Sequence, residues 1–422
     1  MAKSITILGI ETSCDETAAA VVELKNNRFR VLSSAVASQV DLHKLTGGVV
    51  PEVAAREHVT TIMPTIKLAL NRATIQMSKS KFQINSKAQN SKLNSLDAIA
   101  VTAGPGLLPA LLVGVDTANA LSLATGIPAI PVQHITGHIY ANFVGKSEIR
   151  KPPPWAEKSK RYHNDLRSDK NVIDVRRIKF PLLALVVSGG HSEFILMKNY
   201  LQFKKLGQTL DDAAGECFDK CAKILGLPYP GGPQISKAAL NGNPKAFNFP
   251  RPLLRSKSYG GQARFPDGNL NFSFAGLKTA VLYKVNDLVK IKNQKSKIKN
   301  TNKNSKLPKQ TTADLAASVQ AAIVETLVKK TERAIKKNKP KSFTLGGGVA
   351  ANSELRNQLR NLLSDNFPKV KYYETKVEYA TDNAVMIAAV GAMLARKNFT
   401  KKLGGKKLSK FVKANPQLEI KQ

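Results

Sequence analysis

One local pattern occurs twice along this chain, and it constrains the fold more than any other feature. An apolar strand, a turn of small residues and a second apolar strand are expected within 4–24, and the same order returns within 182–198. After each occurrence, further strands alternate with helices, which is typical of α/β proteins. We therefore predict an α/β protein with a duplicated, two-lobed fold and a ligand cleft between the lobes.

The expected elements follow from apolar periodicity and from the positions of Gly and Pro. In the first half, strands are expected at Ser4–Ile10, Ala18–Leu24, Arg30–Ser38, Leu96–Thr102 and Ala129–Val132, and helices at Pro51–Arg72, at Pro109–Thr125 and from His134 onward. In the second half, strands are expected at Leu182–Val187, Glu193–Lys198, Leu201–Gly207 and Ser342–Leu345, and helices at Asp211–Leu225, Ala313–Lys336, Asn352–Leu363 and Asp382–Arg396.

The lobes are expected at 1–145 and 181–422, joined by a basic insert or linker at 146–180. We expect the last helix to pack back on the first lobe. Three segments of low hydrophobicity and biased composition are predicted to be mobile loops, at about 74–94, 146–179 and 290–311.

Apolar runs and cysteines favour a cytoplasmic protein without a membrane partner. No run approaches 18 uninterrupted apolar residues, and the first residues lack the apolar region of a signal peptide. The three cysteines do not suggest a disulfide framework, so a reducing compartment fits best. Cys217 and Cys221 are four residues apart, which is not CxxC spacing, and we interpret them as buried free thiols.

The net charge of +35, from 65 Lys and Arg against 30 Asp and Glu, favours a polyanionic partner. The alternative is that the charge belongs to solvated lysine loops, since residues 290–309 contain eight lysines and no acid. If nucleic acid is the partner, the basic segments at 146–179 and 290–311 and the tail after Arg396 are the expected phosphate contacts.

Three Gly-rich or small-residue turns each follow an expected strand, at 9–17, 187–191 and 345–352. Such turns present backbone N–H groups to a phosphate or let a ligand approach closely, although ordinary hairpins use the same residues. Together they suggest a nucleotide site between the lobes. The chain contains neither GxxxxGK[ST] nor GxGxxG, which argues against a P-loop and a dinucleotide fold.

His134 and His138 in the stretch HITGH lie on one face of an expected helix, so both imidazoles can reach one metal ion. Asp382 at the start of a later helix is a candidate third ligand, which spacing alone does not show. Ile135 occupies the position that Glu has in HExxH, which counts against a metallopeptidase.

These stretches, taken together, resemble the TsaD family, also called Gcp, and Kae in archaea and eukaryotes. Its members are tRNA N6-adenosine threonylcarbamoyltransferases. The stretches that carry the resemblance are GIETSCDET (9–17), GGVVPEVAAREH (47–58), TAGPGLLPALLVG (102–114), HITGH (134–138), VSGGH (187–191), DDAAGECFDK (211–220), YPGGP (229–233), FSFAGLK (272–278), GGGVAAN (346–352) and TDN (381–383). The resemblance implies the fold of the sugar kinase–actin–heat-shock ATPase superfamily.

The resemblance also implies site residues. It implies that His134, His138 and Asp382 bind one divalent metal per subunit, with Fe²⁺ as first choice and Zn²⁺ as the alternative. The residues implied to line the substrate site are Val186, Val187, Ser188, Gly189, Gly190, Asp219, Gly232 and Asn352. Glu11 and Asp15 are weaker candidates near a phosphate or the nucleophile. Ser236 stands where some relatives carry an acid, which puts a direct ligand contact at that position in doubt.

The activity implied by the resemblance is transfer of a threonylcarbamoyl group from L-threonylcarbamoyladenylate to N6 of adenosine 37, with release of AMP. The acceptors are tRNAs that read codons beginning with A. The implied protein partners are a TsaB-like paralogue and a TsaE-like ATPase. The alternatives are a metallopeptidase, a kinase or ATPase suggested by the fold alone, and a non-catalytic RNA-binding scaffold.

Overall fold

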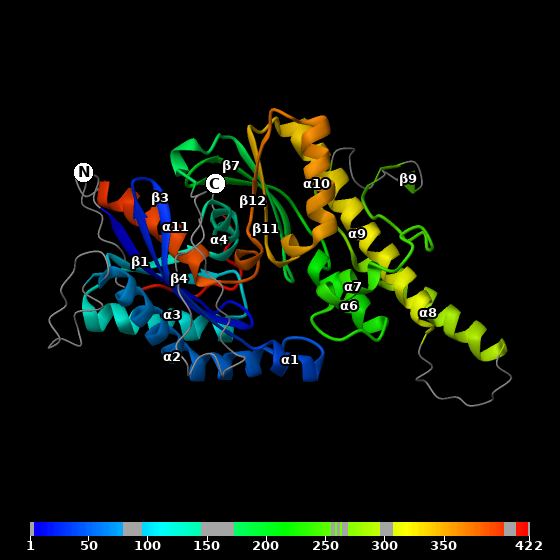
Figure 1. Ribbon diagram of the computed structural model, residues 1–422, viewed down its shortest axis with the longest axis horizontal. Helices are drawn as coiled ribbons and strands as arrows, with labels where there is room; N and C mark the ends of the chain where they lie inside the picture. Colours follow the sequence, from blue (N-terminus) through cyan, green and yellow to red (C-terminus); the bar gives the residue numbers. More distant parts are fainter. Residues whose placement is uncertain are drawn as a thin grey trace.

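The computed structural model describes residues 4–78, 95–144, 173–254, 258–259, 262–263, 269–295, 307–400 and 411–420. Two five-stranded mixed sheets form the centres of the two lobes (Figure 1). The segments predicted to be mobile loops lie mostly outside the described residues, so that prediction stays open for 79–94, 145–172 and 296–306.

The sheet of the first lobe has the order β3-β2-β1-β4-β5. Its strands are β1 (Ile5–Glu11), β2 (Glu16–Lys25), β3 (Arg28–Ser38), β4 (Ala98–Gly104) and β5 (Ala129–Gln133). The first three strands are antiparallel neighbours, whereas β1, β4 and β5 run parallel. The carboxyl ends of β1, β4 and β5 therefore meet at one edge of the sheet.

The sheet of the second lobe repeats this topology, with the order β12-β11-β6-β7-β8. Its strands are β6 (Leu182–Val187), β7 (Ser192–Asn199), β8 (Gln202–Gln208), β11 (Ser342–Gly346) and β12 (Lys371–Glu374). Strand β6 corresponds to β1, because it pairs antiparallel with β7 and parallel with β11. The prediction of a duplicated α/β fold is confirmed.

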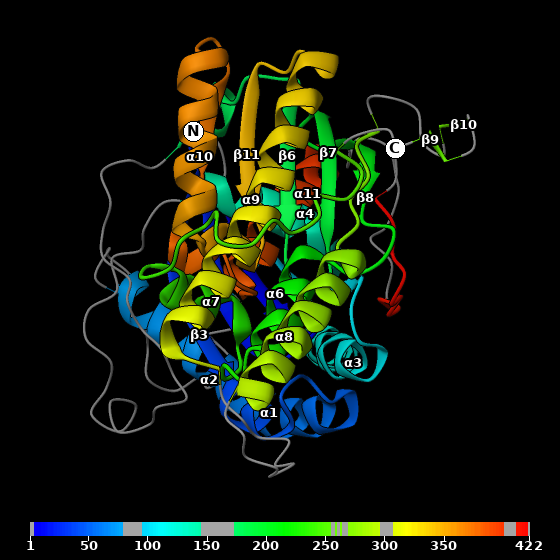
Figure 2. The ribbon, with the colours of Figure 1, turned by 90° about the vertical axis from the view of Figure 1, so that its right-hand side faces the viewer.

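Helices separate and cover the two sheets, so the molecule has five layers (Figures 1 and 2). On the first sheet, α2 and α3 cover the outer face, while α4 and α11 lie between the sheets. The outer face of the second sheet is covered by α6, α9 and α10. The helices are α1 (Val40–Thr46), α2 (Pro51–Ser78), α3 (Leu108–Thr125), α4 (His134–Tyr140), α6 (Ala214–Ile224), α7 (Gly231–Ala239), α8 (Ala275–Lys295), α9 (Lys309–Asn338), α10 (Ser353–Asn366) and α11 (Ala384–Thr400). A short hairpin is formed by β9 (Ser258–Tyr259) and β10 (Gln262–Ala263).

Each central strand is buried on both faces, which explains its uninterrupted apolar run. In β1, Ile7 points into the core between the sheets, and Leu8 points into the core under α2 and α3. In β6, Ala184 points into the same inter-sheet core, and Leu185 points into the core under α6 and α9. One hydrophobic core is thus shared by both lobes.

Helix α11 follows the last strand of the second lobe but packs on the first sheet, where its neighbours are β1, β2 and β4. Gly9 makes this approach possible, because a Cβ there would lie only 2.3 Å from the backbone oxygen of Ala384. The residues just before α11 are thereby carried across to the edge where β1, β4 and β5 end.

Several elements were not expected from the sequence. Helices α1, α7 and α8 and strand β12 are additional, and α2 continues to Ser78. Helix α8 extends to Lys295 and α9 begins at Lys309, so both ends of the segment predicted as a loop at 290–311 are helical. The lysines that suggested a loop are compatible with a helix surface, because Lys is a good helix former.

Among the described helices, α3 is long and apolar enough to cross a membrane by length and composition. It packs against α2 and β4 and buries Ala110, Leu111 and Val115. These contacts bury part of the apolar surface of α3 inside the first lobe.

Candidate metal centre at the junction of the lobes

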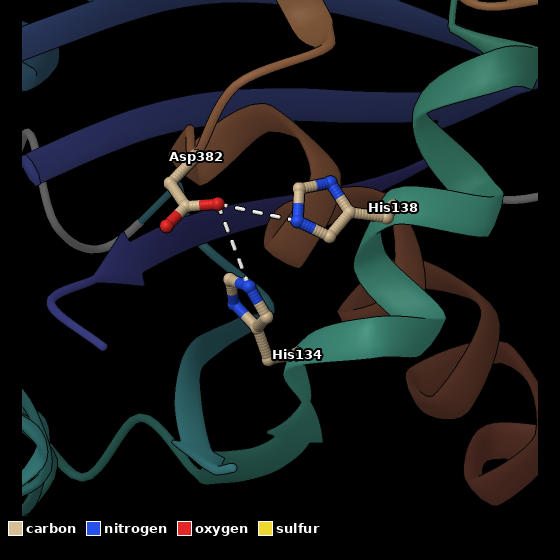
Figure 3. A group of neighbouring side chains, drawn as sticks. All are labelled: His134, His138 and Asp382. Carbon is tan, nitrogen blue, oxygen red and sulfur yellow. Dashed lines mark ion pairs between the residues drawn. The ribbon is translucent and has the colours of Figure 1, made fainter. Parts of the chain in front are cut away.

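Two histidines and one aspartate converge where the lobes meet (Figure 3). His134 begins α4, His138 lies one turn later, and Asp382 directly precedes the segment that leads into α11. Oδ1 of Asp382 lies 3.4 Å from Nε2 of His134 and 3.2 Å from Nε2 of His138. The three predicted ligands, which lie far apart in sequence, thus present their ligand atoms within 4.8 Å of one another.

The local sequence explains why α4 begins at His134. The side chain of Gln133 caps the helix, because its Oε1 accepts a hydrogen bond of 2.8 Å from the backbone N–H of Thr136. Gly137 lets α4 lie directly against α11, since a Cβ there would be 3.0 Å from Met386 and Ile387. Both histidines are buried, and their rings meet edge to face.

Glu11 lies behind His134, on the side away from Asp382. Its Oε2 is 3.1 Å from Nδ1 of His134 and also accepts a hydrogen bond of 2.6 Å from Thr102 Oγ1. Its Oε1 accepts a hydrogen bond of 2.6 Å from the backbone N–H of Ser13. A carboxylate only accepts, so Nδ1 of His134 carries a proton, and Nε2, which faces Asp382, is the nitrogen that a metal ion would use.

Burial and charge act in opposite directions on these groups. Burial lowers the pKa of His134, but the negative charges of Asp382 and Glu11 outweigh it and raise the pKa to about 9. Burial lowers the pKa of His138, whereas the two histidines hold the pKa of Asp382 well below its usual range in spite of burial. The positive charge on the histidine side balances the Asp382 carboxylate, and a bound cation could take over that role.

The residues present fit a divalent metal ion. Among the residues that the structure describes, Nε2 of the fully buried His138 meets Asp382 Oδ1 at 3.2 Å without hydrogen-bond geometry, and its Nδ1 has no hydrogen-bond partner. A metal ion bound at Nε2 would give this buried nitrogen a well-oriented partner. Two imidazole nitrogens and one carboxylate are the donor set of non-haem Fe(II) sites and also suit zinc.

Asp15 of the first lobe and Asp219 of the second lie close enough for their charges to interact, and Asp15 also interacts with Asp382. Burial raises the pKa of Asp15, and the charge of Asp382 raises it further. Burial raises the pKa of Asp219 against its hydrogen bonds from the backbone of Gly231 and Gly232, and Asp15 adds to the increase. The bond from the N–H of Gly231 to Asp219 Oδ1 is 2.7 Å long. Two carboxyl groups from different lobes thus influence each other near the candidate metal centre.

The predicted substrate segment Val186–Gly190 divides into two parts. Val186 and Val187 are fully buried in β6, so their side chains belong to the cores, and only their backbone can meet a ligand. Gly189 and Gly190 are exposed in the turn that follows. Ser188 stabilises this turn, because its N–H donates to the His191 carbonyl at 2.7 Å and its Oγ accepts from the His191 N–H at 3.1 Å.

Asn352 uses its side chain within the protein. Its Oδ1 accepts a hydrogen bond from the N–H of Leu355 and caps α10, while its Nδ2 donates to Ser236 and Gln320, each at 2.9 Å. Ser236 lies in α7, the helix that begins with Gly231 and Gly232. Asn352 therefore connects the third Gly-rich turn to the YPGGP segment, and its role in substrate binding stays a prediction.

His191 was not among the predicted site residues, although the VSGGH stretch contains it. Its ring centroid lies 6.3 Å from that of His134. Burial, followed by the charges of His134 and His138, lowers the pKa of His191 to about 3, so the ring is neutral near pH 7. Because His191 is far from HITGH in the sequence, its proximity to His134 was not predicted.

Known proteins resemble this chain over most of its length. The model of the family described as "TsaD: tRNA N6-adenosine threonylcarbamoyltransferase" matches residues 30–156 and 169–389. Three proteins named tRNA N6-adenosine threonylcarbamoyltransferase are similar over most of their length. That of Thermosipho africanus is 41% identical and covers 93% of this chain and 96% of its own. That of Geobacillus kaustophilus is 42% identical, covering 100% and 98%, and that of Thermomicrobium roseum is 42% identical, covering 93% and 92%.

Among solved structures, the crystal structure of T. kodakarensis HypF is similar at a TM-score of 0.49 and 12% identity. The match covers 93% of this chain but only 48% of that one, so this chain spans about half its length. A likeness this low carries no argument about activity.

Proposed function

The chain belongs to the tRNA N6-adenosine threonylcarbamoyltransferase family, and from this premise we propose that it transfers a threonylcarbamoyl group to N6 of adenosine 37 in tRNA. The donor in this proposal is L-threonylcarbamoyladenylate, and the acceptors are tRNAs that read codons beginning with A. The bond between N6 and the carbamoyl carbon forms, the bond from that carbon to the phosphate oxygen breaks, and AMP and one proton leave.

The observation that supports this proposal most is the convergence of His134, His138 and Asp382 at the junction of the lobes. These residues would hold one divalent metal ion, with iron as first choice and zinc as the alternative. When bound, such an ion supplies Lewis-acid polarisation of the acyl group. The chain itself orients the ligands, since Glu11 holds the Nδ1 proton of His134 and turns Nε2 toward Asp382.

The remaining site residues are assigned to binding. The exposed Gly189 and Gly190 offer backbone N–H groups that suit the adenylate phosphate, in a turn that Ser188 stabilises. Asp219, Gly232 and Asn352 are proposed to lie along the nucleotide or the acyl chain, and Asp15 near the phosphate or the nucleophile. An exocyclic amine is a weak nucleophile, so holding both reactants in line is the main contribution of these residues.

We also propose partners and a location. The excess of positive charge suits tRNA as a polyanionic substrate. A TsaB-like paralogue and a TsaE-like ATPase are the proposed protein partners, and the cytoplasm is the proposed compartment. A separate enzyme would make the donor, because nothing in this chain is assigned to that step.

The test combines the purified chain with L-threonylcarbamoyladenylate, unmodified tRNA and both protein partners, followed by nucleoside analysis. The expected result is threonylcarbamoyladenosine at position 37 and an equal amount of AMP. Release of ADP from ATP by this chain would favour a kinase instead. Absence of the modified nucleoside with all partners present would show that the proposed activity is wrong.

A further inference from the structure

The segment Phe411–Ile420, here called the C-terminal tail, returns to the first lobe after α11. It runs between β8 and α3 (Figure 2, in red). Val412 is buried with the core under α2 and α3, and Ala414 and Leu418 pack against the same core. These three side chains anchor a segment in which most other residues, Lys413 among them, are exposed, so the expected phosphate contacts of this region stay a prediction.

Asn119 of α3 holds the tail by two hydrogen bonds. Its Oδ1 accepts from the backbone N–H of Val412 at 2.8 Å, and its Nδ2 donates to the backbone oxygen of Val412 at 2.9 Å. This arrangement satisfies both backbone groups of a buried residue, so it fixes the start of the tail.

The tail then pairs with the turn after β4. The N–H of Asn415 donates to the oxygen of Ala103 at 2.7 Å, and the N–H of Gly106 donates to the oxygen of Pro416 at 3.4 Å. Gly104 has a φ of +146°, and a Cβ there would lie 1.8 Å from the oxygen of Asn415. The turn is therefore shaped to receive the tail.

This turn is in direct contact with the residues behind His134. The N–H of Leu107 donates to the oxygen of Ser13 at 2.9 Å, and a Cβ on Gly106 would lie 2.6 Å from that oxygen. Ser13 in turn donates its N–H to Glu11, and its Oγ lies 3.2 Å from Nδ1 of His134. Three successive contacts thus connect the tail to the His134 ring, from tail to turn, from turn to Ser13 and from Ser13 to the ring.

A second connection reaches the same histidine from the other side. The Nε2 of Gln133 donates to the oxygen of Leu418 at 3.3 Å, while its Oε1 caps α4. The tail therefore orients the residue on which the first turn of the ligand helix depends. The ion pair between Glu419 and Lys205, at 3.5 Å, is largely exposed on the Glu419 side and contributes little.

We propose that the C-terminal tail is a positioning element of the metal centre, acting through the Ala103–Gly106 turn and Gln133 to set the orientation of His134. The proposal rests on the proposed function in so far as that function assigns a metal to His134. A tail that served only to cover the core under α3 would stabilise the fold without changing the histidine.

The experiment compares Asn119→Ala, which removes both hydrogen bonds to Val412, with a chain that ends at residue 410. Thr117→Ala on the same helix is the matched control, because within the described ranges the Thr117 hydroxyl bonds to the backbone of its own helix, at Val113, and not to the tail. Circular dichroism checks that each variant is folded, and carboxypeptidase digestion followed by mass spectrometry reports whether the tail is released.

Two readouts then address the centre itself. Co²⁺ titration gives the affinity and the visible absorption spectrum of the loaded protein, and long-range ¹H–¹⁵N spectra of the metal-free protein give the histidine tautomers. We expect release of the tail to weaken Co²⁺ binding by about tenfold, to change the absorption bands and to shift the His134 nitrogen signals. Thr117→Ala should match the parent protein in every readout.

The proposal is overturned if the tail is released but the Co²⁺ affinity, the absorption bands and the His134 signals do not change. The tail would then be only a packing element. If the parent protein binds no Co²⁺, the metal assignment fails, and the histidine spectra of the metal-free variants decide the role of the tail. If Asn119→Ala keeps its tail, the shortened chain supplies the comparison.

Discussion

Nδ1 of His134 donates a hydrogen bond to Glu11 in the interior of the protein, while Nε2 of the same ring faces Asp382. The donor and the acceptor come from different elements, since Glu11 ends β1 and His134 begins α4. A carboxylate behind an imidazole fixes the tautomer and increases the basicity of the ligating nitrogen. The orientation of this candidate ligand thus depends on a residue that does not itself face the proposed ion.

Replacing His134 or Asp382 by Ala should remove bound metal and transfer activity while the chain stays folded. Each substitution deletes one of three ligands, and two ligands hold a divalent ion far more weakly. Elemental analysis of the purified variants measures the loss. His191→Ala is the control. The His191 ring lies near the triad but is not one of its three proposed ligands, so this variant should keep its metal. Full occupancy in both ligand variants would exclude the triad assignment.

Glu11→Gln should weaken metal binding by about 10- to 100-fold without unfolding the protein, since the amide has no charge and permits either tautomer of His134. Competition with a chelator gives the affinity. Glu23→Gln on the neighbouring strand β2 is the control. It makes the same change to an acid whose partner is Arg30, so it should leave the metal affinity unchanged. Equal affinities in both variants would show that Glu11 has no part in the centre.

The isolated chain should show little turnover, because the proposed paralogue and ATPase are missing. Adding both partners should increase multiple turnover measured as modified nucleoside per enzyme. Strong multiple turnover by the chain alone would contradict the proposed dependence.

Lysines between α8 and α9 should contribute to tRNA affinity through the phosphate backbone. We propose replacing Lys297, Lys299, Lys303 and Lys306 by Gln, since α8 ends at Lys295 and α9 begins at Lys309. Each lost phosphate contact should make the slope of log affinity against log salt shallower by about 0.7–0.9. Metal content is the control and should not change. An unchanged slope and affinity would identify this segment as solvated and uninvolved.

Lys330 of α9 is fully buried and donates to the oxygen of Asn269 at 2.9 Å. Burial, followed by repulsion from Arg333, lowers the pKa of Lys330 to about 8, below its ordinary value of 10.5. Between these values the unfolded chain binds more protons than the folded one, so this group makes stability rise with pH in that window. Below about pH 8 the burial penalty is fully present.

Lys330→Met should therefore remove this rise between about pH 8 and 10.5, by at most roughly 3 kcal/mol. Urea unfolding at several pH values measures the free energy of unfolding of both proteins, and their difference isolates Lys330 from other titrating groups. Parallel pH profiles would show that the pKa of Lys330 is the same in the folded and unfolded chains.

Local sequence was sufficient for most strands of the two large sheets and for part of the candidate metal centre. The apolar runs of β1 and β6 are buried on both faces, so their composition alone revealed them. The spacing of His134 and His138 placed both rings on one helical face, which is a local property. Strand β12 and helix α8 were missed because one is short and the other is rich in lysine.

Tertiary structure alone decided which distant residues meet. Asp382 reaches the histidines because α11 crosses from the second lobe to the first sheet, an approach that depends on Gly9. Glu11, His191 and the C-terminal tail are likewise placed near His134 by packing between elements far apart in the chain. Spacing along a sequence describes the face of a helix or strand, whereas contacts between such faces depend on how the shared core closes around them.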